Sequence, residues 1–401
     1  MITGRDIVYI SSIEWSFLWQ GHQEIARRLA AAGNRVFYVE NTGVRSPGLR
    51  DAGRVAQRLR RWLTAARTSG VREVAPNIFL CSPLILPPLG PRWRRAVNRR
   101  ALLPAIRRAT RRLGMRDPLI WTYLPTDTAA DLIRILRGPR SGVVYYCVAD
   151  FTQLTPQAER LREHEREVVE MSDVVYTNCS ALARSFSRWN PNAHVFPFGV
   201  DLEAFRLNPN PSLNGAGRLA ELPRPVVGYV GGLHRHVDFE MLERMARERP
   251  GWSWVYIGAS QADVGGLGAL PNVHFLGQRP HKELGGYVGQ FDVCIVPYAK
   301  SAYTDTVVPT KINEYLAMGK PVVSTDIPTV LEFNEEHGVL LTAPCEPAPF
   351  LAAIEKAVSL PSDSEAVRRR REVAELADWK TRFEQMNDLF EARLRETGRH
   401  P

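Results

Sequence analysis

The feature of this sequence that most constrains its fold is an alternation of apolar, strand-like runs with amphipathic helical segments. The first series opens with a strand at 5–12, a helix at 20–33 and a strand at 34–41. A strand–helix–strand unit this short predicts two parallel strands joined by a crossover helix. The same pattern predicts later strands of this series at 118–125, 142–150, 173–180 and 193–199.

The alternation starts again after a segment at 206–225 that is rich in Pro, Asn and Gly. Such a composition is typical of a linker between domains. The second series predicts a helix at 238–249 and strands at 225–233, 252–260, 272–277, 291–298 and 321–325. We therefore predict an α/β fold of two doubly wound, Rossmann-like domains, 1–204 and 205–375.

The last segment, 376–401, has apolar residues at helical spacing and predicts a terminal helix. This helix either packs on the second domain or crosses back to cover the first, and periodicity does not separate the two arrangements. A length of 401 residues agrees with two domains.

The composition is that of an ordinary globular protein, with 44% hydrophobic and 24% charged residues. Five dispersed cysteines without a CxxC pair favour free thiols in a reducing compartment. The first residues include an acid, and no segment reaches about 18 uninterrupted apolar residues, so neither a signal peptide nor a transmembrane helix is expected. We expect a cytoplasmic protein.

Positive charge is concentrated in the first half of the chain. Residues 1–200 hold 30 Arg against 16 Asp and Glu, a balance of +14, whereas the remainder holds 22 basic and 27 acidic residues, a balance of −5. These balances add to the net charge of +9. The asymmetry indicates that the first half faces a polyanion.

Two arginine-rich segments, 50–67 and 92–112, carry most of this charge, and the second holds nine arginines and no acid. Basic amphipathic segments with Trp are typical of peripheral binding to anionic lipid. A solvated face in an arginine-rich proteome is the alternative, since no lysine precedes Lys282. No nucleic-acid-binding motif is present, so we expect no nucleic-acid partner. Pro104 is expected to kink or divide any helix in the second segment.

The stretch VVPTKINEYLAMGKPVVST (307–325) predicts a helix between Pro309 and a buried strand. Lys311 would lie in the first turn, next to Thr310, where a cation opposes the positive end of the helix dipole. An anion near that end would resolve the conflict. Glu314 shares a face with Lys311 and could accept hydrogen bonds from ribose hydroxyls. The alternative is a simple surface ion pair between these two side chains.

A second candidate element is the glycine turn of VVGYVGGLHRH, where Gly231 and Gly232 follow a predicted strand. Alone, this pattern is most simply a tight turn. Combined with the loop at 272–284 and with Lys311, it gathers small residues and a cation at the carboxyl ends of parallel strands, where such sheets bind ligands. Close backbone approach and helix amides would suit a diphosphate.

At these residues the sequence resembles the GT-B glycosyltransferases, in particular the retaining family 4, or group 1. The likeness covers nearly the whole chain. It is strongest over GYVGGL (228–233), FLGQRPHKEL (275–284), FDVCIVPY (291–298) and PTKINEYLAMGKPVV (309–323), and it extends to 11–40 and 196–205.

The resemblance implies two domains facing a cleft and a nucleotide-sugar donor bound mainly by the second. It places Glu314 on the ribose, while Thr306 stands where the family has another glutamate that Asp305 could replace. The family's Arg and Lys pair after the glycine turn is also missing here. Lys311, with Thr310 and Arg235, would then meet the diphosphate, and the backbone of Arg279 would contact the base. The donor would be UDP- or GDP-linked, with UDP favoured.

In the first domain, Asp150 ends a predicted strand and is either a catalytic group beside the presumed cleft or a helix cap. His22 starts the first helix after a tryptophan-rich loop and either reaches phosphate or acceptor, or simply packs. Lys311, Asp150 and His22 are the catalytic candidates.

The resemblance implies transfer of a sugar, with retention of configuration, to a saccharide or lipid-linked saccharide acceptor, in cell-surface polysaccharide or glycoconjugate synthesis. No Asp-x-Asp is present, so no metal is expected, and no cofactor is expected either. The alternatives are a nucleotide-sugar epimerase or a phosphorylase of a related fold and a noncatalytic, membrane-associated protein that has kept the fold.

Overall fold

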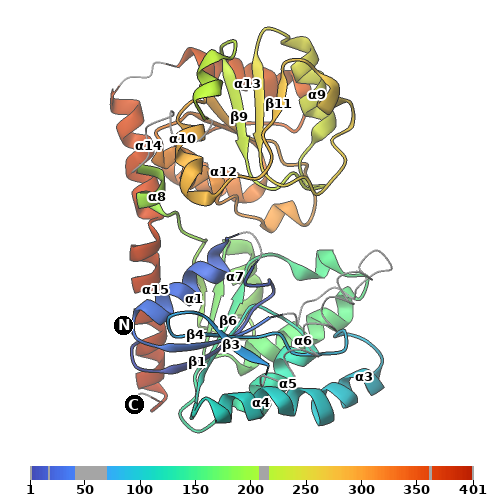
Figure 1. Ribbon diagram of the computed structural model, residues 1–401, viewed down its shortest axis with the longest axis vertical. Coiled ribbons are helices and arrows are strands. Elements are labelled where there is room, and N and C mark those ends of the chain that lie inside the picture. Colours follow the sequence, from blue (N-terminus) through green and yellow to red (C-terminus); the bar gives the residue numbers. More distant parts are fainter. Residues whose placement is uncertain (1, 17–18, 41–69, 207–215, 361–363, 400–401) are drawn as a thin grey trace. The chain divides into compact units, whose positions relative to one another are not determined.

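The computed structural model describes residues 2–16, 19–40, 70–206, 216–360 and 364–399. The chain forms two compact units, one of Met1–Pro197 with Phe383–Pro401 and one of Phe198–Arg382 (Figure 1). The boundary between the units, after Pro197, comes earlier in the chain than the predicted boundary between residues 204 and 205. It does so because Val200 already pairs with the second unit, where its amide donates to Ala377 O at 2.8 Å.

The first unit is built on an eight-stranded sheet in the order β3-β4-β2-β1-β5-β6-β7-β8. All neighbouring strands are parallel except the antiparallel pair β3 and β4, which the alternation did not predict. The predicted strands are all present. The strands are β1 (Asp6–Ile10), β2 (Arg35–Val39), β3 (Val71–Ala75), β4 (Ile78–Cys81), β5 (Leu119–Thr122), β6 (Val143–Cys147), β7 (Val174–Thr177) and β8 (Ala193–Val195).

Helices connect the strands of this sheet. The basic segment 92–112 is helical throughout, and its middle, Asn98–Leu102, is a π-helical stretch. Pro104 lies in the first α-helical turn after this stretch and does not interrupt the helix. The segment 50–67 lies outside the described residues. The helices are α1 (Gly21–Ala31), α3 (Arg92–Val97), η2 (Asn98–Leu102), α4 (Leu103–Arg112), α5 (Asp127–Leu136), η3 (Phe151–Leu154), α6 (Ala158–Met171) and α7 (Ser180–Ser187).

The second unit has a six-stranded, fully parallel sheet in the order β11-β10-β9-β12-β13-β14. Five of these strands were predicted, and the short edge strand β14 was not. The strands are β9 (Val226–Val230), β10 (Ser253–Ile257), β11 (Val273–Phe275), β12 (Val293–Val296), β13 (Val322–Thr325) and β14 (Leu341–Ala343).

Helices also connect the strands of this sheet. Those that matter for the site are α9 (Phe239–Glu248), η7 (His281–Glu283), α10 (Leu284–Val288), η8 (Thr304–Thr306) and α11 (Lys311–Ala317). The others are α8 (Leu202–Arg206), η5 (Ala216–Glu221), η6 (Gly265–Ala269), α12 (Pro328–His337), α13 (Pro347–Ser359) and α14 (Ser364–Leu376).

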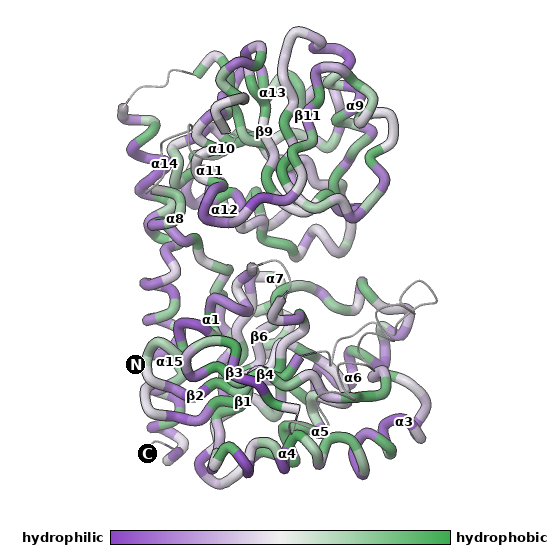
Figure 2. Tube along the Cα trace, viewed as in Figure 1, coloured by the Kyte–Doolittle hydropathy of each residue, from purple (hydrophilic) through white to green (hydrophobic). Residues whose placement is uncertain are grey.

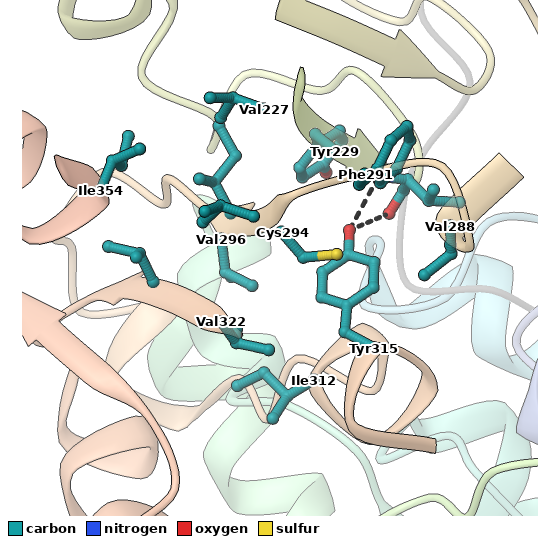
Figure 3. Close-up of a cluster of buried hydrophobic side chains, with 14 of the residues drawn as sticks. Val227, Tyr229, Val288, Phe291, Cys294, Val296, Ile312, Tyr315, Val322 and Ile354 are labelled. Carbon is teal, nitrogen blue, oxygen red and sulfur yellow. Dashed lines mark hydrogen bonds between the residues drawn. The ribbon is translucent and has the colours of Figure 1, made fainter. Parts of the chain in front are cut away.

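The core of the second unit fixes helix α11 against the sheet. Ile312, Tyr315 and Leu316 are buried, as their helical spacing predicts. The hydroxyl of Tyr315 accepts a 2.8 Å hydrogen bond from the amide of Val230, the last residue of β9 (Figure 3). In both units the central strands are mostly hydrophobic, while the helices alternate hydrophobic and hydrophilic residues (Figure 2). This packing holds the start of α11 close to the end of β9.

The terminal helix α15 (Trp379–Glu396) begins in the second unit and belongs to the first from Phe383 onward. Within the first unit, Phe390 and Leu394 pack so closely on Gly142 that a methyl group there would lie 2.8 and 2.4 Å from their side chains. The hydroxyl of Tyr176 donates to Met386 O at 2.6 Å. Among the described residues, no helix has the length and apolar character needed to cross a membrane.

Candidate functional site

The turn after β9 brings two backbones into direct contact at glycines. Gly231 has φ +145°, and its amide donates to Ile257 O at 2.8 Å. Gly258 has φ +155°, and a Cβ atom there would lie 1.9 Å from Gly231 O. Both residues must therefore be glycine, because other residues rarely adopt this conformation and a side chain would not fit.

Lys311 is the first residue of α11, and its side chain turns inward rather than to solvent. The residue is only 8% exposed. Its ammonium donates to the hydroxyl of Tyr298 at 2.5 Å and lies 4.7 Å and 5.0 Å from the ring centres of Tyr298 and Tyr229. Within the described residues, no carboxylate lies within 4.0 Å of it. A cation held by aromatic rings and one phenol retains the capacity to bind an anion.

The ammonium of Lys311 also borders the glycine turn. A methyl group at Gly231 would lie 2.8 Å from Lys311 Cε and 3.2 Å from Nζ. The structure therefore brings together Gly231, Gly232 and Lys311, as the sequence predicts. A ligand that approached the backbone at this turn would meet the ammonium at once.

Glu314 does not pair with Lys311, so the alternative of a surface ion pair between them is wrong. Its carboxylate is 20% exposed and lies 3.7 Å from His281 Nε2, in the loop after β11. The ring of His281 in turn contacts Phe205 edge-on, at 5.5 Å between centres. Glu314 thus lies one turn beyond Lys311, on the same helix, and close to the loop that the sequence assigns to the base.

The other predicted ligands of this unit are less constrained. Arg235 and Arg279 are both exposed. The guanidinium of Arg279 lies over the ring of Tyr287, 5.8 Å from its centre. Thr310 precedes α11 and makes no side-chain cap for it. Their contacts to a donor stay predictions.

Sequence reasoning missed two side chains at the glycine turn, His234 and Gln261. A methyl group at Gly232 would lie 2.9 Å from Gln261 Nε2 and 3.7 Å from His234 Cδ2. Burial and the charge of Lys311 lower the pKa of His234 to about 4. The position of His234 directly after the glycine turn was a usable signal, whereas Gln261 reaches the turn from the end of another strand.

In the first unit, Asp150 acts as a helix cap. Its carboxylate accepts a hydrogen bond from Thr152 N at 3.0 Å and another from Gln153 Nε2 at 3.1 Å. This arrangement is the capping role that was the alternative to catalysis. A catalytic role for Asp150 stays a prediction.

His22 is almost completely buried at the start of α1. Its ring lies 3.9 Å from that of Tyr123, and its Nε2 lies 3.0 Å from Ser12 Oγ. Burial lowers the pKa of His22 to about 3, so the imidazole is neutral near pH 7. The structure therefore shows the packing role that sequence analysis held open, and contact with phosphate or acceptor stays a prediction.

Comparison with known proteins adds a family match over part of the chain. Residues 224–359 match the family described as "Glycosyl transferases group 1". Over 237 residues the chain is 29% identical to the putative teichuronic acid biosynthesis glycosyltransferase TuaH of Bacillus subtilis (strain 168). That match spans 56% of this chain and 58% of the relative, less than two thirds of its length.

Solved structures resemble the chain over nearly its whole length. Sucrose-phosphate synthase from Thermosynechococcus elongatus has a TM-score of 0.69 and 19% identity, covering 96% of this chain and 98% of that one. HepE of Anabaena in complex with UDP has a TM-score of 0.67 and 14% identity, covering 96% and 99%. At these identities the similarity establishes the fold. The chain thus has the two-domain GT-B fold, and residues 224–359, which include the glycine turn, Lys311 and Glu314, match the group 1 glycosyl transferase family.

Proposed function

We propose that the protein transfers a sugar from a nucleotide diphosphate sugar to a saccharide acceptor with retention of anomeric configuration. The observation that carries this proposal is the buried ammonium of Lys311, which faces the glycine turn and has no carboxylate within 4.0 Å among the described residues. Removing an ammonium from water costs several kcal/mol unless an opposite charge compensates it. The diphosphate of a donor would supply that charge.

The chemistry needs stabilisation of the departing diphosphate, and Lys311 would provide it electrostatically. The backbone at Gly231 and Gly232 lets phosphate oxygens approach without a side chain in the way. The freed phosphate would help to remove the proton from the acceptor hydroxyl, so no protein nucleophile is assigned. Metal and cofactor have no role in this proposal.

The nucleoside would lie toward Glu314, whose carboxylate can accept two hydrogen bonds from ribose hydroxyls. Because the carboxylate of Glu314 lies close to His281, a ribose bound there would be near the loop that also carries Arg279. UDP is favoured over GDP as the nucleotide, and the structural similarity to HepE in complex with UDP supports this choice.

The acceptor would be a saccharide or a lipid-linked saccharide, in cell-surface polysaccharide or glycoconjugate synthesis. The relative named for teichuronic acid biosynthesis supports this pathway class. The protein would act in the cytoplasm, peripherally on the inner face of the membrane, through the basic segment 92–112 and the segment 50–67. Each basic side chain near an anionic surface contributes about 1 kcal/mol.

A thermal-shift panel of UDP, GDP and ADP, each with and without a linked sugar, tests the donor. We expect nucleotides of one base to raise the unfolding temperature. Calorimetry with the same ligand should then give a measurable dissociation constant. Failure of every nucleotide to bind would overturn the proposal.

Two alternative functions are distinguished by product analysis. Transfer releases nucleoside diphosphate only when an acceptor is present, whereas an epimerase changes the donor without releasing it. A noncatalytic protein would bind the nucleotide and do neither. Thr306 stands where the family has a glutamate expected near the donor sugar, and this difference favours a noncatalytic protein.

A further inference from the structure

The glycine turn is bordered by more hydrogen-bond donors than Lys311 alone. Side chains from three elements surround the space that Cβ atoms of Gly231 and Gly232 would fill: the ammonium of Lys311, the amide of Gln261 and the imidazole of His234. Phosphate oxygens need several donors converging on one place. The contacts of the imidazole define which of its two nitrogens carries the proton.

The ring of His234 is held on two sides. Its Nδ1 accepts a hydrogen bond of 3.3 Å from the amide of His236. Its ring centre lies 5.5 Å from that of Tyr298, with the two planes tilted by 54°, and the hydroxyl of Tyr298 accepts a hydrogen bond from Lys311. Because an amide donates to Nδ1, the proton of the neutral ring is on Nε2. His234 therefore carries its hydrogen-bond donor on Nε2, and the charge of Lys311 acts on its ring.

The groups around His234 explain why it is a neutral donor. Burial, and after it the charge of Lys311 and the neighbouring His236, lower its pKa to about 4. A second cation next to Lys311 would repel it, whereas a neutral imidazole adds a hydrogen-bond donor without that repulsion.

We propose that His234 donates a hydrogen bond from Nε2 to the diphosphate of the bound nucleotide sugar, beside Lys311. This inference rests on the proposed function and adds a ligand that the sequence pattern did not assign. A bound diphosphate places negative charge next to the imidazole and raises its pKa. Binding at mildly acidic pH is then accompanied by proton uptake at His234.

The experiment is isothermal titration calorimetry with UDP-glucose and with GDP-glucose, whose diphosphate diesters do not titrate near neutral pH. The proteins are the wild type, His234→Leu, His234→Gln and the matched control His236→Gln, which keeps the backbone amide. Titrations at about pH 8 give affinities. Titrations at about pH 5.5, in buffers of different ionisation enthalpy, give the number of protons taken up.

At the higher pH we expect His234→Leu to weaken donor binding about tenfold or more, as for loss of a hydrogen bond to a charged group. His234→Gln, which retains an N–H donor, should lose less. Proton uptake at the lower pH should occur in the wild type and in His236→Gln and vanish in both His234 variants. A merely structural histidine would not produce this proton linkage.

Wild-type affinity in a folded His234→Leu variant, or unchanged proton uptake in both variants, would overturn the inference while leaving the proposed function standing. Absence of nucleotide binding by the wild type would overturn both. Circular dichroism and the unfolding temperature of each variant establish that it is folded.

Discussion

Helix α4 in the first unit and helix α9 in the second are both ten residues long and both expose arginines, but the surroundings of those arginines differ. In α9 each arginine pairs with an acid one turn earlier, Arg244 with Glu240 and Arg247 with Glu243. In α4 the opposite face is buried, and the exposed arginines have no carboxylate within 4.0 Å among the described residues. These arginines are Arg107, Arg108, Arg111 and Arg112.

An arginine-rich composition does not by itself leave arginines unpaired. In the same unit, Arg28 pairs with Glu24 in α1, and Arg166 pairs with Glu170 in α6. Next to α4, Trp93 is 57% exposed and Val97 is 40% exposed. Uncompensated charge and exposed apolar side chains thus occur together in one segment, as expected of a surface that meets anionic lipid.

The second unit shows the opposite arrangement. The arginines of its helix α9 are compensated at the surface, whereas Lys311 is buried and has no carboxylate within 4.0 Å among the described residues. An exposed cation is solvated by water, so leaving it without an acidic partner costs little free energy. Unpaired exposed cations therefore indicate a ligand only when several lie along one face. A buried cation without an acid costs more, and its lack of a partner points to a missing anion. The two kinds of unpaired charge therefore predict different ligands.

The largest effect is expected from neutralising the face of α4. Changing Arg107, Arg108, Arg111 and Arg112 to Gln should weaken binding to anionic vesicles by about 4 kcal/mol, at about 1 kcal/mol for each residue. Flotation with phosphatidylglycerol vesicles at low and high salt measures it, and neutral phosphatidylcholine vesicles should retain neither protein.

The matched control removes the same charge from paired arginines: Arg244, Arg247, Arg368 and Arg395. If the control and the α4 variant lose vesicle binding equally, net charge alone accounts for binding. The difference between paired and unpaired arginines would then have no effect on it. If the wild type binds nucleic acid but no vesicles, the polyanion is of another class.

The next effect concerns the buried cation. Lys311→Met should weaken nucleotide binding by about 3 kcal/mol, roughly a hundredfold, in the range for loss of one partner of a desolvated charge pair. Without ligand the variant should be as stable as the wild type or more so, because a buried charge without a carboxylate partner is removed. Calorimetry with UDP and thermal unfolding measure the two quantities.

Lys300 provides the control for this prediction, since it is half exposed and pairs with Asp326 at 2.8 Å. Lys300→Met should change nucleotide affinity little. Equal affinity of the Lys311 variant and the wild type would remove Lys311 from the site.

The first unit also buries an ionisable group, Glu165, but here burial favours the uncharged form. Burial raises the pKa of Glu165 to about 7, although its carboxyl is hydrogen-bonded to the hydroxyl of Tyr145 at 2.8 Å. The folded state then binds a proton more tightly than the unfolded state, whose pKa is near 4.5. This contribution to stability is present below about pH 4.5 and is lost as the pH rises to about 7.

Across that window the loss is on the order of 3 kcal/mol. Glu165→Gln keeps a polar partner for Tyr145 and should remove this part of the pH dependence. Urea unfolding of the wild type and the variant at about pH 4.5 and about pH 7 measures how much each free energy of unfolding changes with pH. The contributions of other titrating groups are the same in both proteins and cancel in the comparison. Parallel pH dependence of the two proteins would contradict a neutral Glu165.

The smallest effect is expected at Glu314. Glu314→Gln should weaken binding of the free nucleoside diphosphate by about 1–2 kcal/mol, because a neutral amide accepts hydrogen bonds less strongly than a carboxylate. The same change should have no effect on vesicle binding, which separates the buried site from the basic face. Calorimetry with wild-type affinity would place Glu314 outside the ribose contact.

The sequence by itself determined the two parallel sheets, because buried strands and crossover helices leave a periodic pattern of apolar residues. It also pointed to Gly231, Lys311 and Glu314, since each follows or flanks a strand end where ligands bind. It did not predict β3, β4 and β14, which are short strands at or near the sheet edges.

Only the tertiary structure decided what each polar group touches. The partners of Lys311 are Tyr229 and Tyr298, at the ends of two other strands, and the carboxylate of Glu314 lies near His281 instead of Lys311. His234 and Gln261 likewise converge on Gly232 from different parts of the chain. Local pattern specifies which side chains leave a strand end, but the packing of distant strands and helices sets the distances between them, and these distances determine charge compensation and chemistry.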